Sequence, residues 1–300
     1  MPAATVECVP NFSEGKDPNV ISALARCAGS TPGVTLLDHS GDASHNRSVL
    51  TLAGPPESIL ESAVRLAGMA AARIDLTRHS GVHPRIGALD VLPFVPLAGT
   101  PMEVCIDLAH RAGQQIWDRH RIPSYFYESA ALRPDRRNLA WIRHGQFEGL
   151  RTTALTDPER APDTGGPGLH PTAGAVAIGA RKFLIAFNVN LHSEDLDAAR
   201  EIAGRIRESS GGLRCVKALG LRLNGLVQVS MNLTDFEVTP IRTAFDAVAQ
   251  EAARLRIAIA KSELIGLAPA AALDEAIARH VRLRGFHPQR ILENRLAELK

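Results

Sequence analysis

The 300-residue sequence lacks the features that mark several large classes of protein. It holds no run of about 18 apolar residues, so it predicts no membrane-spanning helix. Its first twelve residues have neither a basic start nor a long apolar core, and so do not resemble a signal peptide. The net charge is only +2, which gives no global field for nucleic acid. We therefore expect a cytoplasmic protein that binds neither membrane nor nucleic acid.

Cysteines and local basic segments are also scarce. The four cysteines form no CxxC pair, and we expect small buried side chains in a reducing compartment: Cys8, Cys27, Cys105 and Cys215. The one arginine-rich stretch covers residues 133–143, which we interpret as a solvated turn and helix face rather than a binding patch.

Hydrophobic periodicity predicts the same order of elements twice. In the first half, strands are expected at residues 6–9, 34–38, 48–53, 88–96 and 123–128, and helices at 17–30, 55–74 and 101–120. In the second half, strands are expected at 182–191, 213–223, 226–233 and 257–264, with helices at 193–212 and from 239 onward. Ser193 is the expected cap and Gly211 with Gly212 the expected stop of the first of these helices. This split β-α-β order predicts an α+β protein whose mixed or antiparallel sheets carry helices on one face, as in ferredoxin-like folds.

Two segments fall outside this pattern. Residues 156–175 are rich in Pro, Gly, Asp and Thr without a period, which is typical of a linker or a binding loop. Residues 282–300 predict one further amphipathic helix, for packing or for a dimer contact.

The stretch "HSGVHPRIG", residues 79–87, is the candidate site. Two histidines four residues apart would share one face of a helix and suggest a metal site. Pro84 disfavours a helical backbone at His83, and no Glu follows His79, so a metal is not favoured. The remaining alternatives are a structural turn and a catalytic loop, where a histidine can transfer protons near neutral pH.

Six motifs together resemble one family. They are "VECVPNFSEG", "NRSV", "HSGVHPRIGALDVLPFVPL", "GARKFLIAFNVNL", "IRESSGG" and "QVSMNLTDFEVTP", and they span about residues 6–273 in this order. The sequence is similar to the formiminotransferase family, in its stand-alone form without a cyclodeaminase domain. The resemblance implies two subdomains, residues 1–180 and 181–300, with a folate cleft between them, and a homodimer.

The resemblance also implies an activity. Family members transfer a formimino group from N-formimino-L-glutamate to tetrahydrofolate, which is a co-substrate, and need no metal. Formyl transfer between formylglutamate and tetrahydrofolate, or folate binding without turnover, are the alternatives. The histidine of the "HPR" triplet is the family's catalytic residue, here His83, and one histidine can serve as base and then as acid. His79 then has a loop-ordering role.

The resemblance assigns folate binding to the loop between the halves. Its residues here are Gly165, Gly166, Pro167, Gly168, Leu169, His170, Pro171, Thr172, Ala173 and Gly174. Relatives typically read "DFGP" where this chain reads "DTGGP", so an aromatic contact to the pterin is missing from the loop.

The glutamate donor has four candidate contacts, Asp42, Asn46, Arg47 and Arg85. Arg47 and Arg85 could each meet a carboxylate or form a structural ion pair. Ser40 replaces an acidic residue of the family, so Asp42, His39 or His45 would have to take its place.

Overall fold

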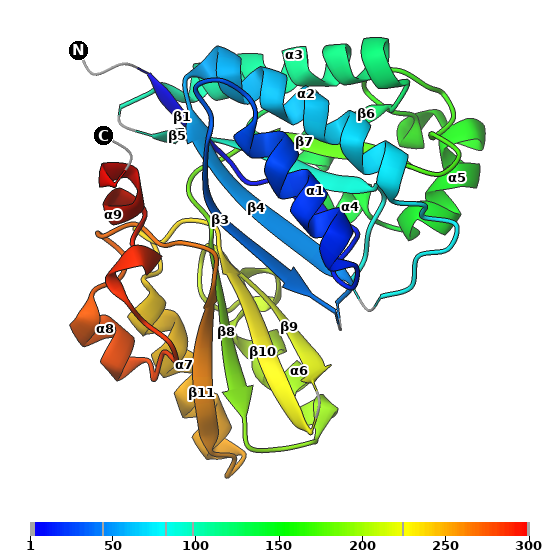
Figure 1. Cartoon of the computed structure of the whole chain (residues 1–300). Helices are drawn as coiled ribbons and strands as arrows, with labels where there is room; N and C mark the ends of the chain where they lie inside the picture. The colour runs from blue at the N-terminus through cyan, green and yellow to red at the C-terminus, as the bar shows by residue number, and fades with distance from the viewer. Residues whose placement is uncertain (1–3, 44, 82, 98, 224, 299–300) are drawn as a thin grey trace. The chain divides into compact units, whose positions relative to one another are not determined.

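The computed structural model describes residues 4–43, 45–81, 83–97, 99–223 and 225–298, and the chain divides into two compact units, Met1–Arg181 and Lys182–Lys300 (Figure 1). Each unit holds one β-sheet with its own hydrophobic core. Within the described residues, no helix is both long and apolar enough to cross a membrane.

The sheet of the first unit is built around an interrupted strand. Its two pieces, β1 (Thr5–Cys8) and β2 (Asn11–Phe12), both lie between β4 (Arg47–Gly54) and β5 (Leu89–Leu97) and run antiparallel to them. On one side, β3 (Thr35–Asp42) pairs with β4. On the other side, β7 (Val176–Ala180) is parallel to β5, and β6 (Ser124–Glu128) is parallel to β7.

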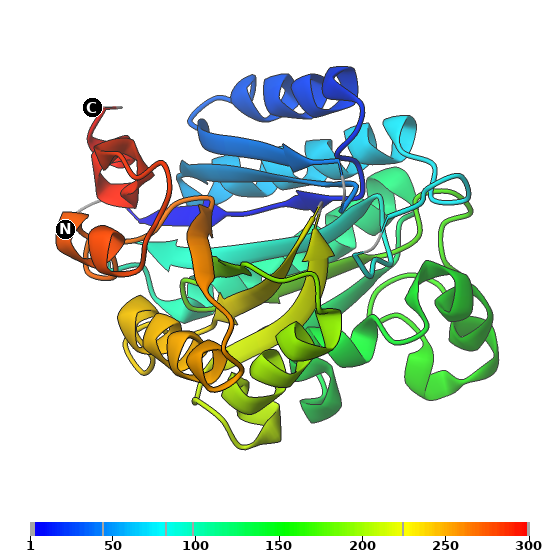
Figure 2. The same cartoon turned by 90° about the horizontal axis from the view of Figure 1, so that it is seen from below.

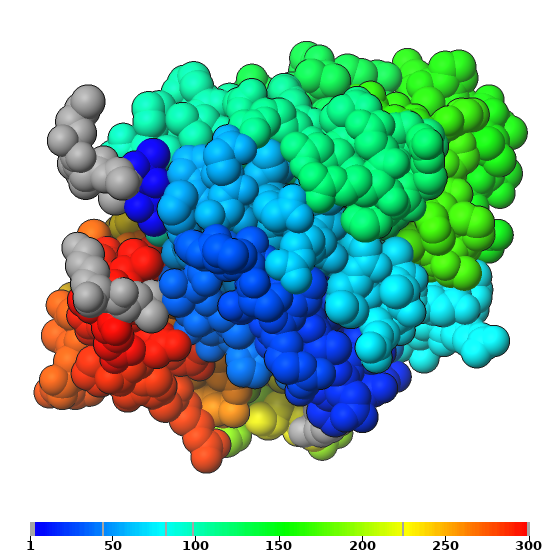
Figure 3. All heavy atoms as spheres, turned by 45° about the horizontal axis from the view of Figure 1, so that its top comes forward, coloured from blue at the N-terminus to red at the C-terminus, as the bar shows by residue number. Residues whose placement is uncertain are grey.

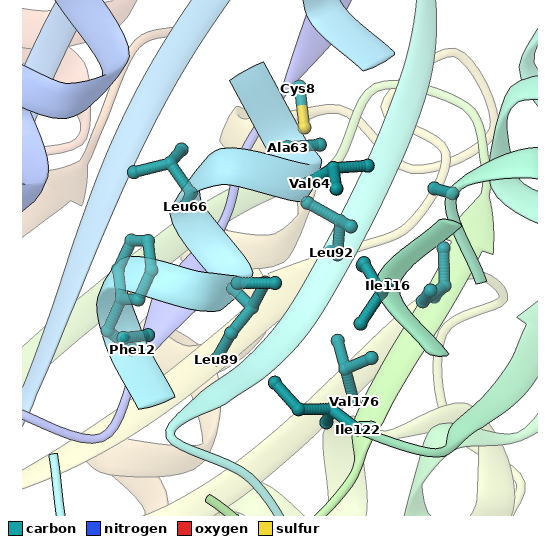
Figure 4. Close-up of a cluster of buried hydrophobic side chains, with 14 of the residues drawn as sticks. Cys8, Phe12, Ala63, Val64, Leu66, Leu89, Leu92, Ile116, Ile122 and Val176 are labelled. Carbon is teal, nitrogen blue, oxygen red and sulfur yellow. The ribbon is translucent and has the colours of Figure 1, made fainter. Parts of the chain in front are cut away.

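Three long helices cover one face of this sheet and lie side by side (Figure 1). They are α1 (Pro18–Gly29), α2 (Pro56–Arg73) and α3 (Met102–His120), and their outer surface faces the viewer in Figure 3. Asp17 caps α1 through the Asn19 amide, and Pro18 is its first residue, as the sequence predicts. Figure 4 shows the core beneath them, with Val64 of α2 and Ile116 of α3 near Leu92 of β5.

Part of the opposite face is covered as well. Side chains alternate along a strand, so Tyr125 and Tyr127 point away from Phe126, which belongs to the core under the long helices. The two tyrosines pack with Ile142 of α4 (Leu139–Ile142) and Leu150 of α5 (Gln146–Thr156). The prediction of helices on one face therefore holds for the three long helices, and α4 and α5 form a small second layer. Two short 3-10 turns flank them, η1 (Pro134–Arg137) and η2 (Pro158–Arg160).

The second unit confirms the ferredoxin-like prediction. Its four antiparallel strands have the order β11 (Ile259–Ile265), β8 (Ile185–Leu191), β10 (Leu226–Leu233) and β9 (Val216–Leu223). Helices α6 (Leu196–Ile206) and α7 (Ile241–Arg254) lie side by side along one face of this sheet (Figure 2). Because every second residue of β8 is apolar and buried in that core, the period-2 pattern alone identifies the covered face.

Three local predictions were wrong. Asp195 caps α6, and Ser193 instead accepts a hydrogen bond from the Asp195 amide. The helix ends at Ile206, before a 3-10 turn at Glu208–Ser210 and the glycine pair. The C-terminal segment, by contrast, has the expected helix after a turn, although it is short: η4 (Pro288–Arg290) precedes α9 (Leu292–Ala297), and both follow α8 (Glu275–His280). Three cysteines are buried as expected, but Cys215 is half-buried and precedes β9 with a φ of 58°.

Candidate active site

The histidine segment and the inter-half loop are hydrogen-bonded to each other. The amide of Ala88 donates to the Ala173 carbonyl at 2.9 Å, and the amide of Ala175 donates to the Ile86 carbonyl at 3.0 Å. Gly174 lies between them with a φ of +71°, and a Cβ there would be 2.1 Å from the Ile86 oxygen. Only glycine fits this close approach. The two segments that the resemblance assigns to catalysis and to folate are thus neighbours in space.

A β-bulge brings a carboxylate to this place. Asn11 pairs with Val91 and Phe12 with Leu89, so Asp90 is an extra residue in β5. Its side chain is fully buried. One oxygen accepts from the Ile86 amide at 2.8 Å, and the other accepts from Arg47 at 2.7 Å and from Arg143. Burial acts to raise the pKa of Asp90, but the two guanidinium groups and the amide hold it well below its usual value.

Arg47 is largely occupied by this network. Its Nη1 donates to Asp90, and its Nε and Nη2 both donate to the Asn11 side-chain oxygen, at 3.2 and 2.9 Å. Burial lowers its pKa and the Asp90 charge opposes that shift. The sequence left two roles open for Arg47, contact with a substrate carboxylate and a structural ion pair. The structure contains the ion pair, with Asp90.

His83 is half-buried beside these arginines. Its Nδ1 is 2.8 Å from the Pro84 carbonyl oxygen. Since a carbonyl only accepts, Nδ1 carries the proton and Nε2 has a free lone pair. Burial, together with the charges of Arg47 and Arg143, lowers the pKa of His83 to about 3, although Asp90 and the Pro84 carbonyl act in the opposite direction. At neutral pH the imidazole is therefore uncharged and able to accept a proton.

The neighbouring histidine has a different environment. The His79 Nε2 is 3.1 Å from the Asn46 carbonyl oxygen, and its Nδ1 accepts from the Arg85 Nε at 3.0 Å. Both ring nitrogens are occupied, which suits the loop-ordering role that the sequence suggested. Arg85 is buried and makes a two-pronged ion pair with Glu148, at 2.8 and 2.6 Å. It thereby holds the segment to α5.

Asn46 links three stretches of backbone. It adopts a φ of 49°, its side-chain oxygen accepts from the Gly15 amide at 2.9 Å, and its side-chain nitrogen donates to the Ser80 carbonyl at 2.9 Å. A Cβ on Gly15 would lie 2.5 Å from the Arg47 nitrogen, so the first motif packs tightly on the β3–β4 turn.

Asp42 is paired with Arg47 in the β3–β4 register, and its side chain contacts a histidine. Its two oxygens accept from the His45 Nδ1 at 2.8 Å and from the His45 amide at 2.9 Å. The His45 ring meets the His83 ring edge to face, with centroids 6.5 Å apart. Ser40 and His39 lie on β3 opposite Val49 and Leu50, with the side chain of His39 exposed.

The inter-half loop is ordered by its own backbone at one end. His170 and Gly174 exchange two backbone hydrogen bonds at 2.9 and 3.0 Å, and the Leu76 amide donates to the Thr172 carbonyl at 2.8 Å. At the other end, Gly165 lies against the ring of Trp117, where a Cβ would be 2.4 Å away. The loop has no aromatic residue of its own, but α3 places one beside its first glycine.

Sequence reasoning missed Asn11, Asp90 and Arg143 as site residues. The available signal for Asp90 was one acidic residue inside the apolar strand sequence "ALDVLPFVPL". Arg143 lay within the arginine-rich stretch interpreted as a solvated face, yet its side chain is only 14% exposed. Among the described residues, no group of three His, Cys, Asp or Glu side chains could hold a metal ion.

The buried carboxylate gives a stability prediction. Asp90→Asn removes the charge that two poorly exposed arginines share, and loss of one partner of a buried ion pair commonly costs about 3–5 kcal/mol. We expect urea denaturation to show a loss of about 3 kcal/mol or more. Asp118→Asn is the matched control, because the exposed Asp118 carboxylate bonds to no side chain but Gln114 within the described part of the chain. It should change stability by less than about 0.5 kcal/mol. Equal stabilities of the two variants would contradict the central place of Asp90.

Comparison with known proteins agrees with this architecture. The family model for the formiminotransferase domain, N-terminal subdomain, matches residues 5–181, and that for the formiminotransferase domain matches residues 186–287. A glutamate formimidoyltransferase of Streptococcus pyogenes serotype M1 is 46% identical over 297 residues, 98% of this chain and 99% of the relative. One from Thermoplasma acidophilum is 42% identical, covering 97% of each chain. The formimidoyltransferase-cyclodeaminase of Gallus gallus is 43% identical over 93% of this chain and 53% of the relative. The chain belongs to the formiminotransferase family.

Proposed function

We propose that this protein transfers the formimino group of N-formimino-L-glutamate to tetrahydrofolate and releases L-glutamate. The names of its two full-length relatives support this activity. The observation that carries it is the state of His83: an uncharged imidazole whose Nε2 is free, beside two arginines and on the segment bonded to the loop at residues 165–174.

The chemistry explains why a neutral histidine is useful. A secondary amine of the reduced pterin attacks the amidine carbon of the donor and becomes a cationic nitrogen that must lose its proton. His83 Nε2 accepts that proton as the general base. The carbon of a protonated amidine is already electrophilic, so the attack needs no metal.

The charges of the site suit a glutamate donor. Arg47 and Arg143 share one carboxylate, Asp90, so two positive charges face one negative charge. The surplus positive charge attracts the carboxylates of N-formimino-L-glutamate. Arg143 is the arginine we assign to this contact, because its Nε is buried with no hydrogen-bond partner among the described residues. We assign Asn46, Arg47 and Arg85 to holding the site in shape.

We assign the pterin to residues 165–174, as the resemblance implies. Glycines at 165, 166 and 168 let a flat ligand approach the backbone closely. Trp117, which lies against Gly165, supplies an aromatic surface there in place of the aromatic residue that the loop lacks. Activity in a homodimer stays a prediction.

Substitution of His83 tests the assignment of the base. General acid–base catalysis is commonly worth about two to four orders of magnitude in rate. His83→Ala should lower kcat for formimino transfer by about that range while tetrahydrofolate still binds. His79→Ala should cost about tenfold, because it removes only hydrogen bonds that order the loop. Near-normal turnover in His83→Ala together with a large loss in His79→Ala would exchange the two roles. Parallel assays with formiminoglutamate and formylglutamate identify the donor.

Hydrogen exchange tests the folate assignment. Saturating tetrahydrofolate should slow exchange of the Gly168 and Leu169 amides, which have no backbone partner among the described residues. The Gly174 and Ala175 amides are the internal control, because both are already hydrogen-bonded and should change little. Identical exchange at residues 168 and 169 with and without the ligand would argue against binding at this loop.

Chelation tests the metal-free mechanism. Activity should survive prolonged treatment with a strong chelator, because His83 Nε2 and the protonated amidine supply the base and the electrophile. Loss of activity that added zinc restores would disprove this prediction.

A further inference from the structure

A second histidine faces His83 and is held by a carboxylate. The His45 side chain is only 16% exposed, and its Nδ1 lies 2.8 Å from Asp42 Oδ2. A carboxylate only accepts, so the His45 Nδ1 carries the proton. Its Nε2 has no hydrogen-bond partner among the described residues. A carboxylate on Nδ1 fixes the tautomer and ring orientation of a histidine and stabilises the imidazolium when it forms.

The two imidazoles are arranged as a pair. Each has its Nδ1 engaged, by Asp42 in His45 and by the Pro84 carbonyl in His83, and each has a free Nε2. Their centroids are 6.5 Å apart and their planes are inclined by 65°. They come from different elements, the β3–β4 turn and the segment entering β5, so the fold and not the local sequence brings them together.

This spacing fits the reaction proposed above. The nitrogen that loses a proton and the nitrogen that gains one are bonded to the same tetrahedral carbon, about 2.4 Å apart. Each can form a hydrogen bond of about 2.8 Å to a side chain. Two proton-transferring groups about 5–8 Å apart can therefore serve the two nitrogens at once.

The charges around the two rings differ in sign. Burial and the charges of Arg47 and Arg143 disfavour a positive charge on His83, so the ring enters the reaction unprotonated and has no proton to give at the start. At His45 the neighbouring charge is instead a carboxylate, because Asp42 Oδ2 lies 2.8 Å from its Nδ1. The two rings therefore suit opposite tasks, although the resemblance gave both tasks to His83.

We propose that His45, positioned by Asp42, is the proton donor to the departing glutamate nitrogen, while His83 accepts the proton of the pterin amine. This inference rests on the proposed function. In the step, the pterin nitrogen bonds to the amidine carbon and gives its proton to His83 Nε2. His45, which enters the step with a proton on each ring nitrogen, gives its Nε2 proton to the glutamate nitrogen, and the bond from carbon to that nitrogen breaks. Solvent returns the proton from His83 to His45, so protons balance over one turnover. Asp42 thus takes a positioning role, and it lies two residues beyond Ser40.

The test compares pH profiles of kcat for the wild type, His45→Gln and His83→Gln. The titratable side chains in contact with the His45 ring are Asp42 and His83. The charged groups around them are Glu14 and Lys16 near the histidine segment, and Arg47, Asp90 and Arg143 beside His83.

A proton donor makes kcat fall on the alkaline side, where it has lost its proton. We expect His45→Gln to lower kcat about 10²- to 10³-fold and to abolish that alkaline limb, while any acid-side fall remains. His83→Gln should keep the alkaline limb. Asp42→Asn should lower kcat about tenfold and Asp42→Glu should restore most of it, with KM for both substrates changed less than about threefold. His287→Gln is the matched control, since His287 is exposed and, among the described residues, its ring contacts the Gln289 side chain and no charged group.

The outcomes separate the two proposals. If the wild type forms no formiminotetrahydrofolate, the proposed function fails and this inference fails with it. If the wild type is active and His45→Gln keeps near-normal kcat, or loses kcat with an unchanged alkaline limb, His45 is not the donor and only this inference is overturned. Thermal unfolding checks that each variant is folded, and His45→Asn serves as the second substitution if His45→Gln is not.

Discussion

The buried carboxylate of Asp90 is the interaction on which the site depends. A charge inside a protein costs several kcal/mol unless partners compensate for it. Here the partners come from three places in the chain: Arg47 at the start of β4, Arg143 at the end of α4, and the Ile86 amide ahead of β5. Because one side chain satisfies all three, it ties the central sheet, the small second layer and the histidine segment together.

Burial and the two arginines of this cluster together determine the protonation state of His83. Burial is the larger cause of its lowered pKa, the arginines add to it, and the Pro84 carbonyl keeps the ring proton on Nδ1. A donor that brings carboxylates to the arginines would offset their charge and make His83 a stronger base when substrate is present. In the proposed function, the charge of the donor thus links its binding to proton transfer at His83. The neighbours of the two rings differ: His45 lies against the carboxylate of Asp42, and His83 lies beside two arginines.

Much of this molecule could be predicted from its sequence. The apolar periods identified most strands and helices, and the repeated order identified the ferredoxin-like sheet of the second unit. The sequence pattern did not show that β7 inserts between β5 and β6, because a strand's partners in a parallel arrangement are distant in sequence. Nor did it show the second layer, since α4 is a single short turn of helix.

The site was predicted in part, for a physical reason. Motifs marked His83 and Arg47, because these belong to short continuous stretches. Asp90 was missed because its role depends on a bulge, and a bulge becomes visible only when the partner strand is known. Arg143 was missed because a charged residue at a helix end is expected to be exposed. Its burial becomes clear only once its ion-pair partner, Asp90, is known. His45 was noted only as a possible substitute for the acidic residue of the family that Ser40 replaces. Its contact with the His83 ring can be seen only in the folded structure.

The most direct measurement is the titration of His83 by NMR in protein labelled at histidine, assigned by comparison with His83→Gln. The account predicts that, without ligand, the His83 ring stays neutral with its proton on Nδ1 from pH 8 down to pH 5, because its pKa is lowered to about 3. A His83 signal that titrates with a midpoint near 6.5 would contradict the claim that burial and the neighbouring arginines keep this histidine uncharged.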